Sequence, residues 1–209
     1  MHSPHLCLLS SDGRLVLWSF RLALNPWGDT SFFSDTSARV ELLRLSARRD
    51  ANNVPENIWD VWDVPSATRL GTIWGTTPGT ELWQHPWSLV NAAGREVAQQ
   101  VAPAPPGAQP SSLAGAALAG LDSAVASLGG LISSDSASFV VAGGTLVAAL
   151  ASHWSLHAAW SRVDFVAAQR GLALSDELPD MRLVLALALH RAVDEVFNKH
   201  TIEPADIAL

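Results

Sequence analysis

The strongest constraint in this sequence is one design that occurs four times: a short apolar or aromatic run, a small polar turn and a second β-prone run. The four stretches are residues 6–20, 58–74, 87–98 and 139–150, with turns at residues 11–13, 65–68, 91–94 and 143–144. The turns are built from the small and polar residues that hairpins favour, such as the Gly143-Gly144 pair. The pattern therefore predicts antiparallel β-hairpins.

A fifth stretch, residues 181–197, is apolar on nearly all sides when it is drawn as a helix. A helix of this kind is buried. Pro179 and Asp180 stand just before it and supply start and cap chemistry. We therefore expect a mainly β fold with helices, in which the antiparallel hairpins form a sheet or barrel around the apolar C-terminal helix.

The length of 209 residues favours a single β-rich domain, residues 1–209. Within it, residues 101–134 are rich in Pro, Ala and Gly. Prolines dominate the first part of this stretch, and apolar residues recur at helical spacing from 113 to 128. We interpret the stretch as a linker and one inserted helix that packs outside the sheet, and the sequence leaves open whether it is a second unit.

Three shorter segments carry weaker signals. Residues 39–48 suit either a strand or a short helix. Residues 154–160 and 162–169 are expected to be two further strands, although either pattern also suits a helix. Gly71 lies inside a β-prone run, which indicates a bulge or a close approach of another backbone.

Charge disfavours two classes of partner. The net charge is -7, and Lys199 is the single lysine among 13 basic residues. Nucleic-acid binding relies on basic side chains, so we expect no nucleic-acid partner, and the same count disfavours an anionic membrane. Arg44, Arg48 and Arg49 form a basic cluster, which we interpret as a solvated strand face and not as a phosphate site.

The single cysteine, Cys7, excludes an internal disulfide and suits a reducing compartment. Residues 1–5 lack the features of a signal peptide, and no uninterrupted apolar stretch is long enough to predict a transmembrane segment. We expect a cytoplasmic protein, and peripheral association with a membrane stays open.

Motifs for catalysis or metal binding are weak. His153 and His157 are four residues apart, as paired metal ligands on a helix often are, and His190 with Asp194 repeats that spacing. The segment around His153 alternates like a strand, however, and no Glu follows His153 as a zincin requires. The chain also lacks a Gly-x-Ser-x-Gly elbow, a P-loop and a dinucleotide fingerprint. We therefore expect no catalytic residue and no cofactor, with a metal site at His153 and His157 as an alternative.

Two acidic groups offer oxygen ligands for a hard cation. Asp60 and Asp63 lie on a predicted strand, and a second group, residues 176–180, precedes the last helix. No twelve-residue calcium loop is present. Helix capping is the simpler interpretation of the second group.

Nine tryptophans and no tyrosine are the unusual feature of the composition. Five of them lie close together in the sequence: Trp59, Trp62, Trp74, Trp83 and Trp87. Exposed tryptophans on neighbouring strands would form a recognition platform for a protein, a sugar or a lipid interface. Buried tryptophans would simply be core, which is their commoner position. These five are our candidate partner-binding residues.

The order and local pattern of these stretches resemble the family that joins LURP-one-related proteins and phospholipid scramblases, which share the tubby-like fold. The parts that look most alike are residues 60–63 with 70–73, 87–90 with 94–98, 139–141 with 143–148, and 180–194. The resemblance implies a twelve-stranded barrel around the C-terminal helix. It carries over no functional residue, because the chain has no matching basic cluster for phosphoinositides, no cysteine-rich segment and no matching calcium-binding stretch.

The leading hypothesis is a non-catalytic binding or scaffolding module with a tubby-like barrel. It would meet a protein partner or a lipid surface through the tryptophan-rich region or through residues 103–134. A small metal-dependent enzyme that uses His153 and His157 is one alternative, and a structural subunit of a larger assembly is another. The sequence leaves the partner and the oligomeric state open.

Overall fold

The computed structural model describes residues 6–9, 14–19, 29–75, 87–101, 136–143, 145–154, 159–165 and 178–199. These residues form one β-sheet and one helix. The strands are β1 Leu6–Leu9, β2 Leu15–Ser19, β3 Thr30–Phe33, β4 Glu41–Arg49, β5 Pro55–Asp63, β6 Thr68–Gly75, β7 Trp87–Asn91, β8 Glu96–Val101, β9 Ser136–Ala142, β10 Thr145–Trp154 and β11 Ala159–Phe165, and the helix is α5 Met181–Lys199.

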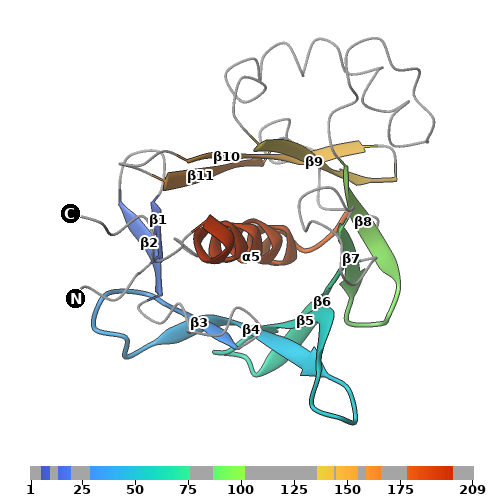
Figure 1. Cartoon of the computed structure of the whole chain (residues 1–209), viewed down its shortest axis with the longest axis horizontal. Coiled ribbons are helices and arrows are strands. Elements are labelled where there is room, and N and C mark those ends of the chain that lie inside the picture. Colours follow the sequence, from blue (N-terminus) through green and yellow to red (C-terminus); the bar gives the residue numbers. More distant parts are fainter. Residues whose placement is uncertain are drawn as a thin grey trace, which may run out of the picture.

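The described strands form one 11-stranded antiparallel sheet, in which each strand pairs with the next one in the sequence. Figure 1 shows the sheet curling around α5, with β3 to β6 on one side of the helix and β9 to β11 on the opposite side. Among the described residues no ladder joins β1 to β11. Backbone pairing within these residues therefore does not close the sheet into a barrel.

The predicted mainly β, antiparallel fold with a C-terminal helix is confirmed. The four predicted hairpins correspond to β1–β2, β5–β6, β7–β8 and β9–β10. The ambiguous segment 39–48 contains strand β4. The inserted helix predicted at residues 113–128 lies outside the described residues. The predicted linker also lies outside them, apart from Val101 at the end of β8.

The strand predicted at residues 154–160 is wrong. β10 continues to Trp154 and β11 begins at Ala159, and the two strands pair antiparallel there. β11 includes residues 162–165 of the other predicted strand, and residues 166–169 lie outside the described residues. β10 extends beyond the expected hairpin because β9 pairs with it as far as Ser152 and β11 pairs with it from Ala148 to Trp154. Backbone pairing on both sides thus outweighs the local pattern that suggested an earlier end.

The turn between β7 and β8 has the geometry that its sequence predicts. The Gly94 amide donates to the Asn91 carbonyl at 3.0 Å, and Gly94 has a φ of 80°. The Arg95 amide donates to the Asn91 side chain, also at 3.0 Å. Glycine accepts this positive φ without steric cost, so the Asn91-to-Gly94 segment fixes the register of the hairpin.

The core lies between α5 and the strands. Alternate residues of β4 and β5 point inward, among them Leu43, Leu45 and Val61. α5 contacts β4, β6, β10 and β11, and it buries Leu183, Val184, Ala186 and Leu187 almost completely. Each large side chain buried in this way contributes about 1.5–3 kcal/mol. Helix side chains therefore occupy the space that the described strands curl around.

Gly71 in β6 confirms the predicted bulge and the predicted close approach. The pairing of β5 with β6 shifts between Val61 and Trp62, opposite this part of β6. A Cβ atom at Gly71 would lie 2.2 Å from the Val90 carbonyl oxygen and 3.0 Å from a methyl group of Leu183. Only glycine lets β6 pass this close to β7 and to the helix.

The start of α5 confirms the predicted capping. The Asp180 carboxylate accepts from the Arg182 amide at 2.9 Å, and the Asp180 carbonyl accepts from the Leu183 amide at 2.9 Å. The Arg182 guanidinium bonds to the same carboxylate and also reaches Asp63 on β5 at 2.7 Å. The cap thus ties the first turn of the helix to the sheet.

Candidate binding face

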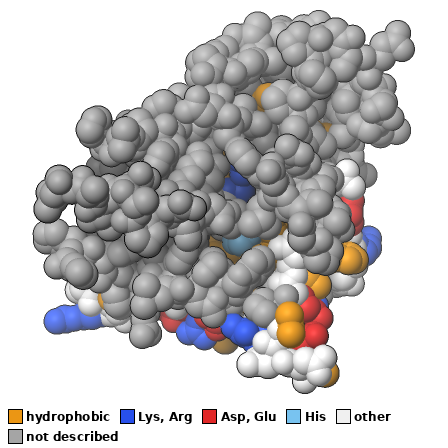
Figure 2. Space-filling view, in the orientation of Figure 1, with side chains coloured by type: hydrophobic (Ala, Val, Ile, Leu, Met, Phe, Trp, Pro, Cys, Tyr) orange, Lys and Arg blue, Asp and Glu red, His pale blue; other side chains and the backbone are white. Residues whose placement is uncertain are grey.

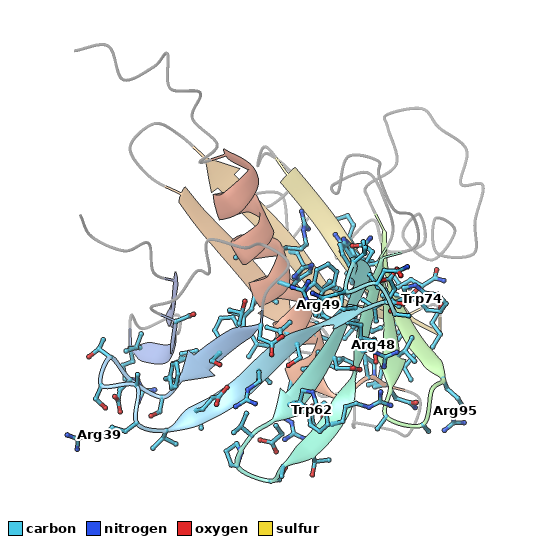
Figure 3. The ribbon with its side chains drawn as sticks, turned by 60° about the horizontal axis from the view of Figure 1, so that its bottom comes forward. Arg39, Arg48, Arg49, Trp62, Trp74 and Arg95 are labelled. Atoms are coloured by element: carbon cyan, nitrogen blue, oxygen red, sulfur yellow. The ribbon has the colours of Figure 1, made fainter. Side chains whose placement is uncertain are left out.

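Strand alternation gives β4, β5 and β6 two different sides. The inward side of β5 carries Trp59 and Val61, both buried, and the residues between and beside them point away from α5. We call this second side the outer face and define it by Arg44, Arg48, Ile58, Asp60, Trp62, Arg69, Thr72 and Trp74. Figure 3 views it with the strands in front of α5 and labels Arg48, Trp62 and Trp74.

Three rows of side chains cross the outer face. In the first row, Trp62 stands opposite Arg44 of β4 on one side and Arg69 of β6 on the other. In the middle row Asp60 stands opposite Thr72, and in the third row Ile58 stands opposite Trp74. Directly opposed residues on neighbouring strands are close enough for their side chains to interact.

Asp60 is the centre of a polar network on the outer face. Arg48 donates from Nε and from Nη2 to the two carboxylate oxygens, each at 2.8 Å. Arg69 donates to Asp60 Oδ1 at 3.2 Å and to the Ala92 carbonyl at 3.0 Å, and Thr72 donates to the carboxylate at 3.0 Å. The network links β4, β5 and β6 and fixes both guanidinium groups in place.

The charges in this network are unequally exposed. The side chain of Asp60 is 17% exposed, whereas those of Arg48 and Arg69 are 40% and 32% exposed. Burial by itself would raise the pKa of Asp60, but the hydrogen bonds from Arg48 and Thr72 and the charges of Arg48 and Arg69 outweigh it, so the pKa is lowered. The hydrogen bond to Asp60 raises the pKa of Arg48. Arg48 and Asp60 are therefore both charged near neutral pH.

Of the five candidate tryptophans, two lie inside the molecule. Trp59 and Trp87 are each 3% exposed, and their ring centroids are 5.5 Å apart. Both contact His190 of α5, at centroid distances of 4.1 Å and 4.9 Å. These two tryptophans form an aromatic cluster in the core, where an outside partner does not reach them.

Two other candidate tryptophans lie on the outer face. Trp74 is 51% exposed and Trp62 is partly exposed. Trp83 lies outside the described residues. The platform predicted from five tryptophans is thus reduced to Trp62 and Trp74, for which a role in partner binding stays a prediction.

Asp60 and Asp63 do not form a joint cation site. Asp60 lies on the outer face among arginines, whereas Asp63 bonds to Ser66 at 2.7 Å and to Arg182 of α5 at 2.7 Å. Asp63 follows Asp60 by three positions on β5, and an odd step along a strand turns the side chain to the opposite side of the sheet. Each carboxylate is already compensated by a guanidinium group.

The alternative metal site falls largely outside what the structure describes. His153 is near the end of β10, at a position where only the backbone is described, and His157 lies outside the described residues. Within the described part of the chain, no group of three or more His, Cys, Asp or Glu side chains could hold a metal ion. A site at His153 and His157 stays untested.

No helix in the described part of the chain is long and apolar enough to span a bilayer. Comparison of the whole chain with protein-family models, with curated proteins and with solved structures finds no match. The resemblance to LURP-one-related proteins and scramblases therefore stays a prediction.

The sequence patterns do not single out the network around Asp60. Arg48 belongs to the basic cluster that the sequence indicates as a solvated strand face, and no sequence pattern assigns a role to Arg69. The available signal is strand parity. Residues 58, 60 and 62 share one side of β5. On that side the carboxylate of Asp60 stands between Ile58 and Trp62, which indicates a surface that combines apolar and charged side chains.

Proposed function

We propose that this protein is a non-catalytic binding or scaffolding module that meets a protein partner on its outer face. The observation that carries the proposal is that one sheet surface presents the exposed Trp74, the partly exposed Trp62 and two arginines that Asp60 holds in place. Tryptophan and arginine are the residues most enriched at the energetic centres of protein interfaces. A partner would gain apolar contact from Trp62 and Trp74 and polar contact from Arg48 and Arg69.

The packing of the opposite side of the sheet supports this choice of surface. The inward side chains of β4 and β5 are buried, and α5 fills the space behind them. The three-strand network around Asp60 holds the outer face rigid. A rigid surface loses little conformational entropy when a partner binds.

We further propose that the scaffold is a tubby-like barrel of the LURP-one-related, scramblase-like type. The consecutive strand order and the helix inside the curl support this proposal. Neighbouring strands alternate in direction, so β1 and β11 run parallel to each other. A barrel that is antiparallel throughout needs an even number of strands, and it would therefore require a twelfth strand between β11 and β1.

A peptide selection tests the proposed function. The full-length protein is used to select binders from a random peptide library, with counterselection on a Trp62→Ser, Trp74→Ser double variant. We expect enriched peptides that bind wild type at least about tenfold more tightly than the double variant. A Val40→Ser variant is the matched control, since Val40 is 50% exposed and lies outside the outer face.

Circular dichroism and thermal unfolding verify that all three proteins are folded. If no enriched peptide discriminates between wild type and the double variant, the outer face is not a binding surface and the proposal fails. If the control variant also loses binding, the effect is not specific to the tryptophans and the proposal fails as well.

A further inference from the structure

We infer that the partner segment is an extended acidic peptide whose carboxylate is bound by Arg48 and Arg69, between two apolar side chains that pack on Trp62 and on Trp74. This inference rests on the proposed function and adds the chemistry of the partner. It follows from the charge balance of the outer face and from the spacing of its three rows.

The centre of the outer face presents positive charge to solvent. Two guanidinium groups share the single carboxylate of Asp60, so these three groups together carry a charge of +1. Each guanidinium has five N–H donors. The bonds to Asp60 and to the Ala92 carbonyl use two donor atoms of each group. The remaining donors of these half-exposed side chains can reach an incoming carboxylate.

The surroundings of this centre are balanced in charge. The arginines on or beside the outer face are Arg44, Arg48, Arg49, Arg69 and Arg95. The carboxylates there are Glu41, Glu56, Asp60, Glu96 and Asp29, whose charge acts on Arg44. Five positive groups thus meet five negative ones, in a chain with a net charge of -7. Figure 2 shows basic, acidic and apolar side chains mixed on this side, at its lower edge. The net charge of the chain is therefore not concentrated on this face, and the two guanidinium groups at its centre remain available to an acidic segment.

Glu56 and Glu41 limit the kind of anion that fits. Glu56 lies close enough to Arg48 to help raise the pKa of that arginine, and Glu41 binds Arg44 at 2.6 Å. A surface dense in phosphates, such as a nucleic acid or an anionic bilayer, would meet these carboxylates as well as the arginines. A peptide with one carboxylate at the centre avoids them.

The spacing of the rows defines the peptide. Ile58 with Trp74, Asp60 with its two arginines, and Trp62 follow one another at every second position of β5. The rows are thus about 7 Å apart along the strand. An extended peptide lying along β5 has the same repeat on one side. Its preferred pattern is apolar, any residue, acidic, any residue, apolar.

Fluorescence anisotropy with labelled peptides tests this inference. The probe is a fluorescein-labelled nonapeptide of glycine and serine with leucine at its third and seventh positions and glutamate at its fifth. The comparison probe has glutamine in place of the glutamate. We expect wild-type protein to bind the glutamate probe at least about tenfold more tightly than the glutamine probe, and we expect added salt to weaken the binding.

Matched variants assign the effect to the outer face. Arg48→Gln is expected to weaken binding of the glutamate probe about tenfold, and Arg39→Gln to change it less than about twofold. Arg39 is exposed and lies at the left edge of Figure 3, well away from Arg48. Because Arg48→Gln also disturbs the Asp60 network, Trp74→Ala at an exposed position serves as a second variant and is expected to weaken binding similarly.

The outcomes separate the two proposals. Equal binding of the glutamate and glutamine probes, lost in Trp74→Ala, would leave the proposed function standing and would overturn the acidic specificity. Absence of binding to the glutamate probe overturns the inference, whatever the peptide selection yields. Tryptophan-dependent binding to vesicles of phosphatidylcholine and phosphatidylserine that is tighter than binding to the probe would replace the peptide with a lipid surface and overturn it too.

Discussion

The imidazole of His190 is buried against the indole rings of Trp59 and Trp87. Its Nε2 has no hydrogen-bond partner in the part of the chain that the structure describes. Burial, assisted by the positive charge of Arg191, lowers the pKa of His190 from 6.5 to about 3. The histidine is therefore neutral in the folded protein over a pH range where it is protonated in the unfolded chain.

This difference predicts a pH-dependent stability. As pH falls below 6.5, the unfolded chain takes up a proton at this position and the folded protein does not, so stability is lost down to a pH of about 3. Between pH 7.5 and pH 5, His190 should remove about 2 kcal/mol from the free energy of unfolding. The carboxylates with lowered pKa lose their contribution only near and below their ordinary values, which are 3.8 for Asp60 and 4.5 for Glu41.

Urea unfolding of wild type and His190→Leu at pH 7.5 and pH 5 measures the effect. The variant should lack the part of the pH dependence that His190 supplies, whatever its absolute stability. An identical pH dependence in the two proteins would mean that His190 is not buried as a neutral group.

Gly71 gives a second test at the residue scale. Gly71→Ala places a methyl group against the Val90 carbonyl and the Leu183 side chain, and it should lower the free energy of unfolding by about 3 kcal/mol. Gly94→Asn is the matched control, because a side chain there meets nothing within 4 Å and asparagine tolerates a φ of 80°. The control should cost less than about 1 kcal/mol. Similar losses in both variants would contradict the close packing of β6, β7 and α5.

The first turn of α5 is the clearest case at the element scale. Asp180→Ala removes the acceptor for the Arg182 amide and should reduce stability by about 1 kcal/mol. Asp180→Asn keeps an acceptor oxygen and should cost only a few tenths of that amount. Chemical unfolding of both variants decides the matter. Equal effects would show that the ion pairs of Arg182, and not the cap, hold the start of the helix.

Elements with strong local signals could be predicted from the sequence. The local sequence is sufficient to predict the Asn91-to-Gly94 turn, because glycine stands where the turn needs a positive φ. It is also sufficient to predict α5, because the segment is apolar on nearly all sides. The end of β10 could not be predicted, since it depends on pairing with β9 and β11. Local propensity is a weaker influence than such tertiary pairing.

The outer face shows the same limit for a site. The sequence alone predicts that Trp59 and Trp62 lie on opposite sides of β5, because an odd number of steps separates them. Which of the two sides faces the core depends on where α5 packs. The meeting of Arg48 and Arg69 at Asp60 depends on the registers of three strands, and bulges shift these registers near Ala47 and Val61. A slip of one residue would turn these side chains to the other side of the sheet.

For the whole molecule, the barrel proposal can be tested through the single cysteine. Cys7 lies in β1, and Val163→Cys adds a second thiol in β11. One strand between them would put their backbones about 10 Å apart. A short bismaleimide should therefore link them within one molecule, whereas oxidation should not form a disulfide. A disulfide would mean that β1 and β11 are direct neighbours, and no link of either kind would mean that the sheet is open.

The central claim is that binding occurs on the outer face and not in the interior. The indole N–H signals of the tryptophans in a two-dimensional ¹⁵N–¹H spectrum test it directly, as the glutamate probe is titrated into the full-length protein. We predict that the signals of Trp62 and Trp74 shift, while those of Trp59 and Trp87 keep their positions. Shifts confined to Trp59 and Trp87 would place the ligand beside α5 and contradict the account.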